Sequence, residues 1–146
     1  MTQDPPAEGL LDDPVVARSR IAGREIISLF EPGEVVRLTM KAGPERFSLG
    51  RGLLAATDKR LLFVYLRIIR SPRTMSFLYD DLAAYSITPS AILAKLVLAR
   101  RDGSTQTFWH VDPLGRVLAL GAMLSSKGCS NTSASSRGLT GATGPG

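Results

Sequence analysis

The sequence predicts a mainly β protein: a seven-stranded, bent antiparallel barrel capped by a C-terminal helix, with an extra amphipathic helix at the N-terminus. Three observations predict this fold. Short apolar runs recur at even spacing between residues 35 and 111, and tight turns separate them. A helical pattern precedes these runs and another follows them. The length of 146 residues, 44% of them hydrophobic and 21% charged, fits one globular domain with extensions.

The first expected element is an amphipathic helix at residues 14–30. Asp13 and Pro14 form an N-cap followed by a proline in the first helical position, and Glu31-Pro32-Gly33 ends the pattern. The apolar stripe between them consists of Val15, Ser19, Ala22, Ile26, Leu29 and Phe30. This stripe must pack on the rest of the protein or on a partner.

Seven strands are expected to follow this helix. Their ranges are 35–40, 53–57, 60–66, 74–79, 83–87, 92–100 and 104–111. Asp58-Lys59 and Asp102-Gly103 are two-residue connections of the kind that closes a tight hairpin, and Pro89-Ser90 is expected to break the chain. Strands joined in this way favour an antiparallel barrel or sandwich.

The closing helix is expected at residues 113–124. Asp112-Pro113 repeats the N-cap and proline pattern, and an apolar stripe runs from Leu114 to Leu124. In residues 125–146, 14 of 22 residues are Ser, Gly or Thr, so a disordered tail is expected with Cys129 as an ordinary exposed thiol. The predicted division is therefore a flexible N-terminus (1–12), the amphipathic helix (13–31), the capped barrel (32–124) and the tail (125–146).

Charge is unevenly distributed along the chain. The 18 Lys and Arg exceed the 13 Asp and Glu, and residues 37–101 hold twelve bases against four acids. Such a basic region favours an anionic partner. One cysteine and one histidine exclude an internal disulfide framework and leave little for a Cys/His zinc site. No secretory signal or membrane-spanning run is visible, so a cytoplasmic protein is expected.

Three motifs suggest catalysis or cofactor binding, and each has a simpler structural explanation. Gly50-Arg51-Gly52-Leu53-Leu54-Ala55 matches a dinucleotide fingerprint, but strand-like residues follow it where a helix is required. His110 is expected to be a surface or helix-start residue instead of a general base or metal ligand. The adjacent Asp80 and Asp81 point to opposite faces of an extended segment, which favours a turn. No catalytic residue, metal or cofactor is therefore expected.

The basic residues are the best candidates for function. One expected inter-strand loop carries Lys41, Arg46 and Arg51, and another carries the segment from Arg67 to Arg73. The second loop includes two apolar residues between its cations. The full candidate interaction surface is Lys41, Arg46, Arg51, Arg67, Ile68, Ile69, Arg70 and Arg73. The alternative interpretation is a solvated rim.

Residues 52–64, GLLAATDKRLLFV, resemble the bacterial pleckstrin-homology-like domains of the YokE type, within the superfamily that also includes GRAM domains. The shared pattern is a glycine at the start of a strand, then Thr-Asp-x-Arg, then an aliphatic and aromatic strand. Tyr79-Asp80-Asp81-Leu82 and Arg101-Asp102-Gly103 resemble later segments of the family. The resemblance covers residues 31–124 and implies a seven-stranded bent barrel capped by a helix.

The resemblance also implies a non-enzymatic interaction module, self-associating or acting near the membrane. The first inter-strand loop, KAGPERFSLGRG, departs from the basic pattern of phosphoinositide-binding relatives, because Arg46 and Arg51 are too far apart. We therefore expect protein–protein binding or self-association. The alternative is peripheral binding to anionic phospholipid through residues 67–73, at the inner face of the membrane. A nucleic-acid partner and a small-molecule substrate are not expected.

Overall fold

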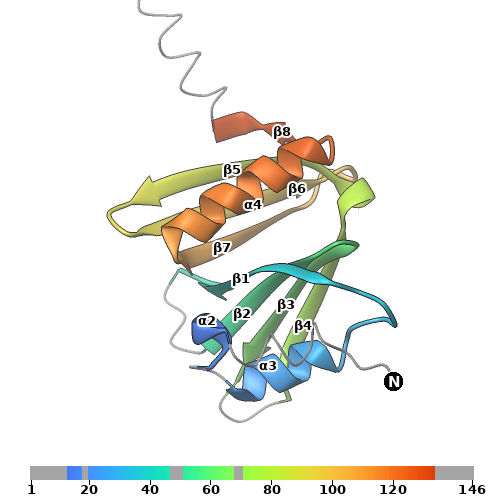
Figure 1. Cartoon of the computed structure of the whole chain (residues 1–146). Coiled ribbons are helices and arrows are strands. Elements are labelled where there is room, and N and C mark those ends of the chain that lie inside the picture. The colour runs from blue at the N-terminus through green and yellow to red at the C-terminus, as the bar shows by residue number, and fades with distance from the viewer. Residues whose placement is uncertain (1–12, 18–19, 47–50, 68–70, 134–146) are drawn as a thin grey trace, which may run out of the picture.

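A strongly bent sheet forms the centre of the protein in the computed structural model, which describes residues 13–17, 20–46, 51–67 and 71–133 (Figure 1). In chain order the elements are α2 (Pro14–Ala17), α3 (Arg20–Ile27), β1 (Val36–Gly43), β2 (Arg51–Thr57), β3 (Arg60–Leu66), β4 (Arg73–Leu78), the 3₁₀ turn η1 (Tyr79–Asp81), β5 (Leu82–Ser90), β6 (Leu93–Arg100), β7 (Thr105–Asp112), α4 (Leu114–Ser126) and β8 (Ser130–Asn131). The order of strands in the sheet is β4-β3-β2-β1-β7-β6-β5-β8.

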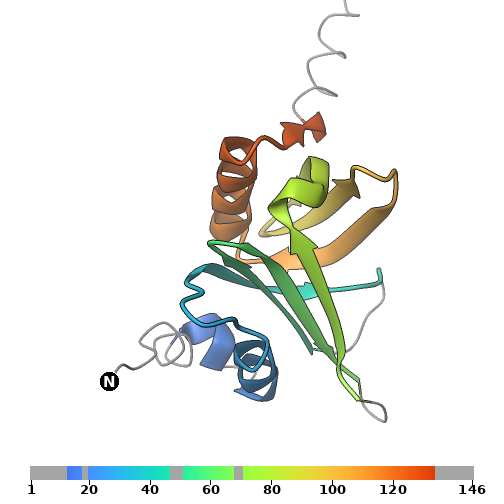
Figure 2. The same ribbon diagram turned by 90° about the vertical axis from the view of Figure 1, so that its right-hand side faces the viewer.

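The sheet bends at β1, which pairs with β2 on one side and with β7 on the other. Figure 2 shows the two halves of the sheet crossing each other, with α4 against the half formed by β5, β6 and β7. Within the described residues β4 does not pair with β5, so the barrel is not closed. The predicted bent antiparallel fold with a capping helix is confirmed, and the eighth strand was not expected.

Strands β2 and β3 are buried on both faces. Leu54 and Phe63 point into the main core between the sheet halves and α4. Leu53 and Leu62, one residue earlier on each strand, point into a second core beneath α2 and α3. Because successive residues of a strand face opposite sides, burial of both faces explains why these two strands are continuous apolar runs.

The second core is formed with the N-terminal helices. Helix is described at Pro14–Ala17 (α2) and Arg20–Ile27 (α3), with residues 18–19 between them outside the described part, and α3 ends at Ile27, earlier than the predicted Phe30. The next turn tightens, with the Leu29 N–H donating to the Ile26 carbonyl, and the Arg60 side chain binds the Leu29 carbonyl. Ala22 and Ile26 of the predicted apolar stripe are buried against the outer face of β2 and β3, which is therefore the surface on which the stripe packs.

Strand β5 runs through Pro89 to Ser90, so the break expected at this proline is wrong. The turn lies one residue later, where Ala91 has φ +53°. A proline is tolerated in an edge strand when its missing N–H would have faced away from the neighbouring strand. The Asp58-Lys59 and Asp102-Gly103 hairpins are where the sequence predicts them.

The C-terminal end of the fold differs from expectation in two places. Asp112 is the last residue of β7 and Pro113 takes the N-cap position of α4, one residue later than predicted. Cys129 is buried and packs in the main core, so its assignment as an exposed thiol is wrong. The chain turns at Gly128, whose φ of +96° suits glycine, and then returns to pair with β5. Residues 134–146 lie outside the described part.

Candidate functional site

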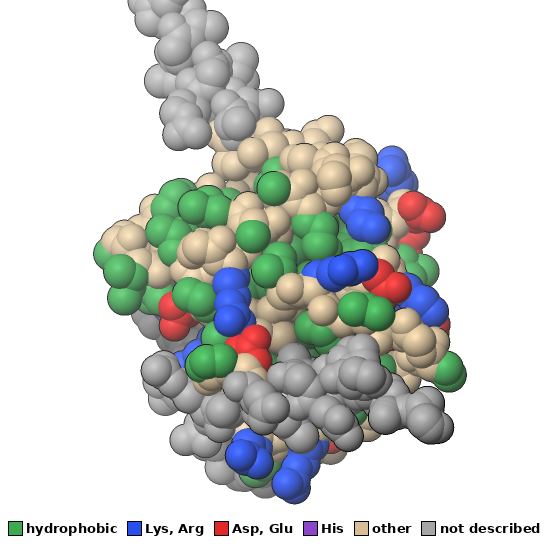
Figure 3. Space-filling view, viewed as in Figure 1, with side chains coloured by type: hydrophobic (Ala, Val, Ile, Leu, Met, Phe, Trp, Pro, Cys, Tyr) green, Lys and Arg blue, Asp and Glu red, His purple; other side chains and the backbone are tan. Residues whose placement is uncertain are grey.

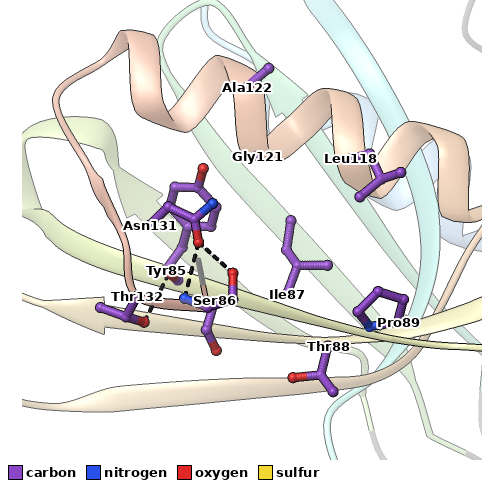
Figure 4. Close-up of a pocket in the computed structure, with 11 residues that line it drawn as sticks. Tyr85, Ser86, Ile87, Thr88, Pro89, Leu118, Gly121, Ala122, Asn131 and Thr132 are labelled. Carbon is purple, nitrogen blue, oxygen red and sulfur yellow. Dashed lines mark hydrogen bonds between the residues drawn. The ribbon is translucent and has the colours of Figure 1, made fainter. Parts of the chain in front are cut away.

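A groove of about 790 Å³ lies between β5, α4 and the segment that contains β8 (Figure 4). The floor comes from β5, one wall from the helix, and one end from the chain after β8. The lining residues are Tyr85, Ser86, Ile87, Thr88, Pro89, Leu118, Gly121, Ala122, Asn131, Thr132 and Ser133. None of them carries a charge, and hydroxyl, amide and apolar side chains alternate around the groove.

Among the described residues, the groove follows a part of the β5 edge that pairs with no strand. On this edge β8 pairs in parallel with Ala84 and Tyr85 only, while β5 continues to Ser90. The Tyr85 carbonyl accepts a hydrogen bond from Thr132 Oγ1, so this residue presents its backbone groups to the outer edge. Backbone groups of alternate residues in a strand point to the same edge, so the backbone groups of Ile87 and Pro89 face the same edge as those of Tyr85. Proline has no N–H, so the outward groups are the Ile87 N–H and C=O and the Pro89 C=O.

Helix α4 is held close to β5 by a glycine and a tyrosine. A Cβ atom at Gly121 would lie 2.9 Å from Ile87 Cδ1 and 3.2 Å from the Tyr85 ring, so the helix approaches here because this residue has no side chain. At the next turn, the Tyr85 hydroxyl and Ser125 Oγ are 2.6 Å apart and share a hydrogen bond. The groove wall is therefore fixed by contacts at the C-terminal half of the helix.

The helix wall exposes apolar surface to solvent. Leu118 is 52% exposed and lines the groove opposite Pro89 (Figure 4). In the space-filling view the surface over α4 and the β5–β6 hairpin is mainly hydrophobic or uncharged, whereas charged side chains lie lower on the same face and along its right-hand side (Figure 3). An uncharged groove with an apolar wall suits a polypeptide segment better than a highly charged ligand.

A second polar cluster surrounds the Thr57–Arg60 hairpin. The Glu34 carboxylate is buried and accepts hydrogen bonds from Thr57 Oγ1 at 2.5 Å, from Arg60 Nε and Nη2 at 3.1 Å, and from the Glu31 N–H at 2.9 Å. Burial raises the pKa of Glu34, but the hydrogen bonds from Arg60, Thr57 and Glu31 outweigh it, and the pKa is lowered overall.

This Glu34–Arg60 network is structural. Arg60 Nη2 also donates to the Leu29 carbonyl at 2.6 Å, which connects the end of the N-terminal helices to the hairpin. The buried Tyr79 hydroxyl donates to the Thr57 carbonyl at 2.5 Å, and burial raises the pKa of Tyr79. The Thr-Asp-x-Arg pattern thus joins three parts of the fold, and its charged groups already have partners inside the protein.

The structure separates the basic residues of the first predicted loop. Lys41 lies within β1 and lines a small cavity with Pro14 and Asp112. Arg46 follows β1 and lines a different cavity, next to Trp109. Arg51 is the first residue of β2. Lys41 and Arg46 therefore do not face one common pocket.

The second predicted loop falls mostly outside the described residues. Arg67 Nε donates to the Ser71 carbonyl at 3.1 Å, and Arg73 is exposed at the start of β4. Ile68, Ile69 and Arg70 lie outside the described residues. The membrane-binding hypothesis for this loop stays a prediction.

The remaining motifs have structural roles. Gly52 is the second residue of β2, and a Cβ atom there would lie 2.1 Å from the Ala42 carbonyl oxygen. Asp80 and Asp81 form the 3₁₀ turn between β4 and β5, and their carbonyls accept hydrogen bonds from Arg101. Among the residues that the structure describes, no three His, Cys, Asp or Glu side chains are grouped as metal ligands. In the same part of the chain, no helix is long and apolar enough to cross a membrane.

The sequence did not single out the groove residues. They are uncharged residues, Tyr85 and Asn131 beside Ser, Thr, Pro, Ala, Gly, Ile and Leu, and they form no recognisable motif. The break assigned to Pro89 concealed the floor formed by β5, and the tail assigned to residues 125–146 concealed the end formed by Asn131, Thr132 and Ser133. The one available indication was Pro89 inside an otherwise strand-like run, which is typical of an edge strand.

Comparison with known proteins supports the fold and leaves function open. No family model and no curated protein matches the sequence. The hSac2 domain of the human phosphoinositide phosphatase Sac2 is similar at 12% identity and a TM-score of 0.54, over 82% of this chain and 88% of that one. A DUF1696 family protein with a pleckstrin-homology domain from Shewanella loihica is similar at 14% identity and a TM-score of 0.50, over 75% of this chain and 91% of that one. The C-terminal domain of an unknown protein from Leishmania infantum is similar at 16% identity and a TM-score of 0.50, over 76% of this chain and 95% of that one.

Proposed function

We propose that this chain, which has the fold of the bacterial pleckstrin-homology-like domains, is a non-enzymatic interaction module that binds an extended segment of a partner protein in the groove between α4 and β5. One observation carries the proposal. A segment of the same chain, β8, already pairs with the edge of β5, and the edge continues beyond it along an open groove. Addition of a strand to an exposed edge is a general mode of peptide binding.

The geometry limits what the partner segment can be. It would run parallel to β5, as a continuation of β8, and would pair with the outward backbone groups of Ile87 and the carbonyl of Pro89. Its side chains would lie against Leu118 and Ala122 on the helix. Because the groove is uncharged, a charged side chain would lose hydration there without gaining a counter-charge. The expected partner segment is therefore extended and uncharged, with small or apolar side chains.

A peptide selection with matched variants tests this function. Peptides selected from a random displayed library against the wild-type protein are then titrated individually. We expect Leu118→Asp to weaken their binding about tenfold or more, because it removes apolar contact and places a charge on the groove wall. Leu78→Asp is the matched control, because Leu78 is 53% exposed and lies at the end of β4, outside the groove.

Equal affinity of the selected peptides for wild type and Leu118→Asp would contradict the groove as the binding site. Failure of the selection to enrich any peptide would count against peptide binding altogether. The lipid alternative is tested separately by flotation with anionic and neutral vesicles, with Arg67 and Arg73 replaced together. Binding to anionic vesicles at low salt that is lost in this variant would favour the lipid function.

A further inference from the structure

The chain leaves the edge of β5 at Asn131, and a side chain holds it in the turn that follows. In the described part of the chain, β8 pairs with β5 through Ser130 and Asn131 alone. Thr132 and Ser133 then form a helical turn. Asn131 Oδ1 accepts hydrogen bonds from the N–H of Ser133, at 3.0 Å, and from its hydroxyl. The strand therefore ends because an asparagine caps this turn, while the edge of β5 continues beyond it.

The turn after β8 is held by local bonds. Both bonds to Asn131 come from a residue two positions away, and Thr132 is exposed to solvent. Side-chain bonds of this local kind compete with strand pairing, and each adds little to stability because water replaces it when it breaks. A continued strand is therefore an accessible alternative for this part of the chain.

The register of β8 predicts how a continued strand would lie. Because β8 is parallel to β5 with Asn131 opposite Tyr85, Ser133 would come opposite Ile87. In a parallel pair, the N–H of a residue donates to the residue before its partner, and its carbonyl accepts from the residue after its partner. The Ile87 carbonyl would therefore accept from the N–H of Ala134. The N–H of the next residue would point away from β5.

The residues that follow the turn have the chemistry that the groove favours. Ala134, Ser135 and Ser136 lie outside the described part of the chain; they are small and uncharged, and the next charge is that of Arg137. The described lining residues of the groove are also uncharged. In the register of β8, residue 136 comes opposite Ser90, the last residue of β5, so the charge would lie beyond the strand, where water can hydrate it.

We propose that residues 134–136 continue β8 along β5 and occupy the groove in competition with a partner segment. Ser133 lines the groove and directly precedes this segment, so the effective concentration of the segment is high without any linker. Its small side chains bury little apolar surface, so it binds weakly and a better-fitting partner displaces it. The chain thereby regulates its own groove. This consequence rests on the proposed function, whereas the occupancy itself does not.

Two proline substitutions test the occupancy without any partner. Ala134→Pro removes the N–H that would donate to the Ile87 carbonyl, whereas Ser135→Pro, the matched control, removes an N–H that would point away from β5. Hydrogen exchange at the Ile87 amide is measured in the wild type and in both variants. We expect exchange to be about threefold faster in Ala134→Pro, which corresponds to an occupancy of about two thirds in the wild type, and unchanged in Ser135→Pro.

Equal exchange at Ile87 in the wild type and in Ala134→Pro would overturn the proposal, as would equal acceleration by the two prolines. The measurement is repeated at a lower protein concentration. Protection of Ile87 that disappears on dilution would also overturn the proposal, because the segment in the groove would then come from a second copy of the chain.

The competition is measured by titrating a selected peptide into the same three proteins. We expect Ala134→Pro to bind the peptide about threefold more tightly than the wild type, because a larger fraction of its grooves is open, and Ser135→Pro to bind like the wild type. Equal affinity of the wild type and Ala134→Pro would overturn the competition. Absence of any binding peptide would contradict the proposed function instead, and the exchange experiment would still decide the occupancy.

Discussion

Replacement of Arg60 by methionine is expected to lower the free energy of unfolding at neutral pH by about 3–5 kcal/mol, the usual cost of removing one partner of a buried ion pair. The side chain of Glu34 is fully buried and that of Arg60 is 15% exposed, so little water can replace the lost guanidinium. The substitution also leaves the Leu29 carbonyl without its donor. Urea denaturation of the wild type and the variant measures the difference.

Lys59→Met is the matched control for this prediction. Lys59 lies in the same hairpin and pairs with Glu31 at 3.6 Å, but both side chains are exposed, so we expect a change within about 0.5 kcal/mol. Equal destabilisation by the two substitutions would contradict a special role for the buried network. Should Arg60→Met fail to fold, Glu34→Gln provides a milder variant, expected to cost about 1–3 kcal/mol because the amide leaves part of the network unsatisfied.

The effect of Arg60→Met should depend on pH. In the wild type the pKa of Glu34 is below its ordinary value of 4.5, so its contribution to stability is complete above that value and is lost as pH falls through the lowered pKa. Without the guanidinium, burial favours the neutral form of Glu34. The stability of the variant therefore rises relative to that of the wild type as Glu34 takes up a proton. The difference in the free energy of unfolding between the two proteins should therefore become smaller at acid pH. A difference that does not change with pH would contradict the assignment of this effect to the Glu34–Arg60 pair.

Replacement of Gly52 by alanine should be the most disruptive single-methyl change in the sheet. The added carbon would lie 2.1 Å from the Ala42 carbonyl oxygen on β1 and 2.9 Å from the Phe63 ring. The backbone oxygen cannot rotate away, so β1 and β2 must separate, and we expect a loss of about 3 kcal/mol or more. Thermal and urea denaturation measure this loss.

Gly115→Ala is the matched control, because this exposed glycine lies in the first turn of α4 with no atom within 4 Å of the added carbon. There alanine should raise stability, by up to about 1 kcal/mol, through its better helix propensity. A Gly52→Ala protein as stable as the wild type would show that β1 and β2 approach each other less closely than described. It would also reopen the question of why glycine stands at the start of β2.

The sheet and its hairpins could be predicted because local chemistry determines them. Asp102-Gly103 and Asp58-Lys59 carry their own turn preferences, and burial on both faces produces the long apolar runs of β2 and β3. The pairing of β8 with β5 could not be predicted, because Ser130 and Asn131 have no strand preference and their position next to β5 depends on tertiary packing, which includes the burial of Cys129.

The groove and a bulge in β7 differ in how much of them the sequence reveals. The groove depends on the distance between α4 and β5, which a glycine at position 121 sets through packing and which no local pattern reveals. The bulge, where β7 has one residue more than β6, left a trace in the sequence, because Phe108 and Val111 are three residues apart and so cannot both face the core of a regular strand.

Hydrogen exchange at the Ile87 amide tests the central claim most directly. This N–H faces the edge of β5 that pairs with no strand beyond Tyr85 in the described part of the chain, and strand addition by a bound peptide would give it an acceptor. We expect a selected peptide to slow exchange at Ile87 by about tenfold or more, while the amides of β4, the other edge strand, stay unchanged. A peptide that binds with full affinity and leaves exchange at Ile87 unaltered would contradict binding by strand addition in this groove.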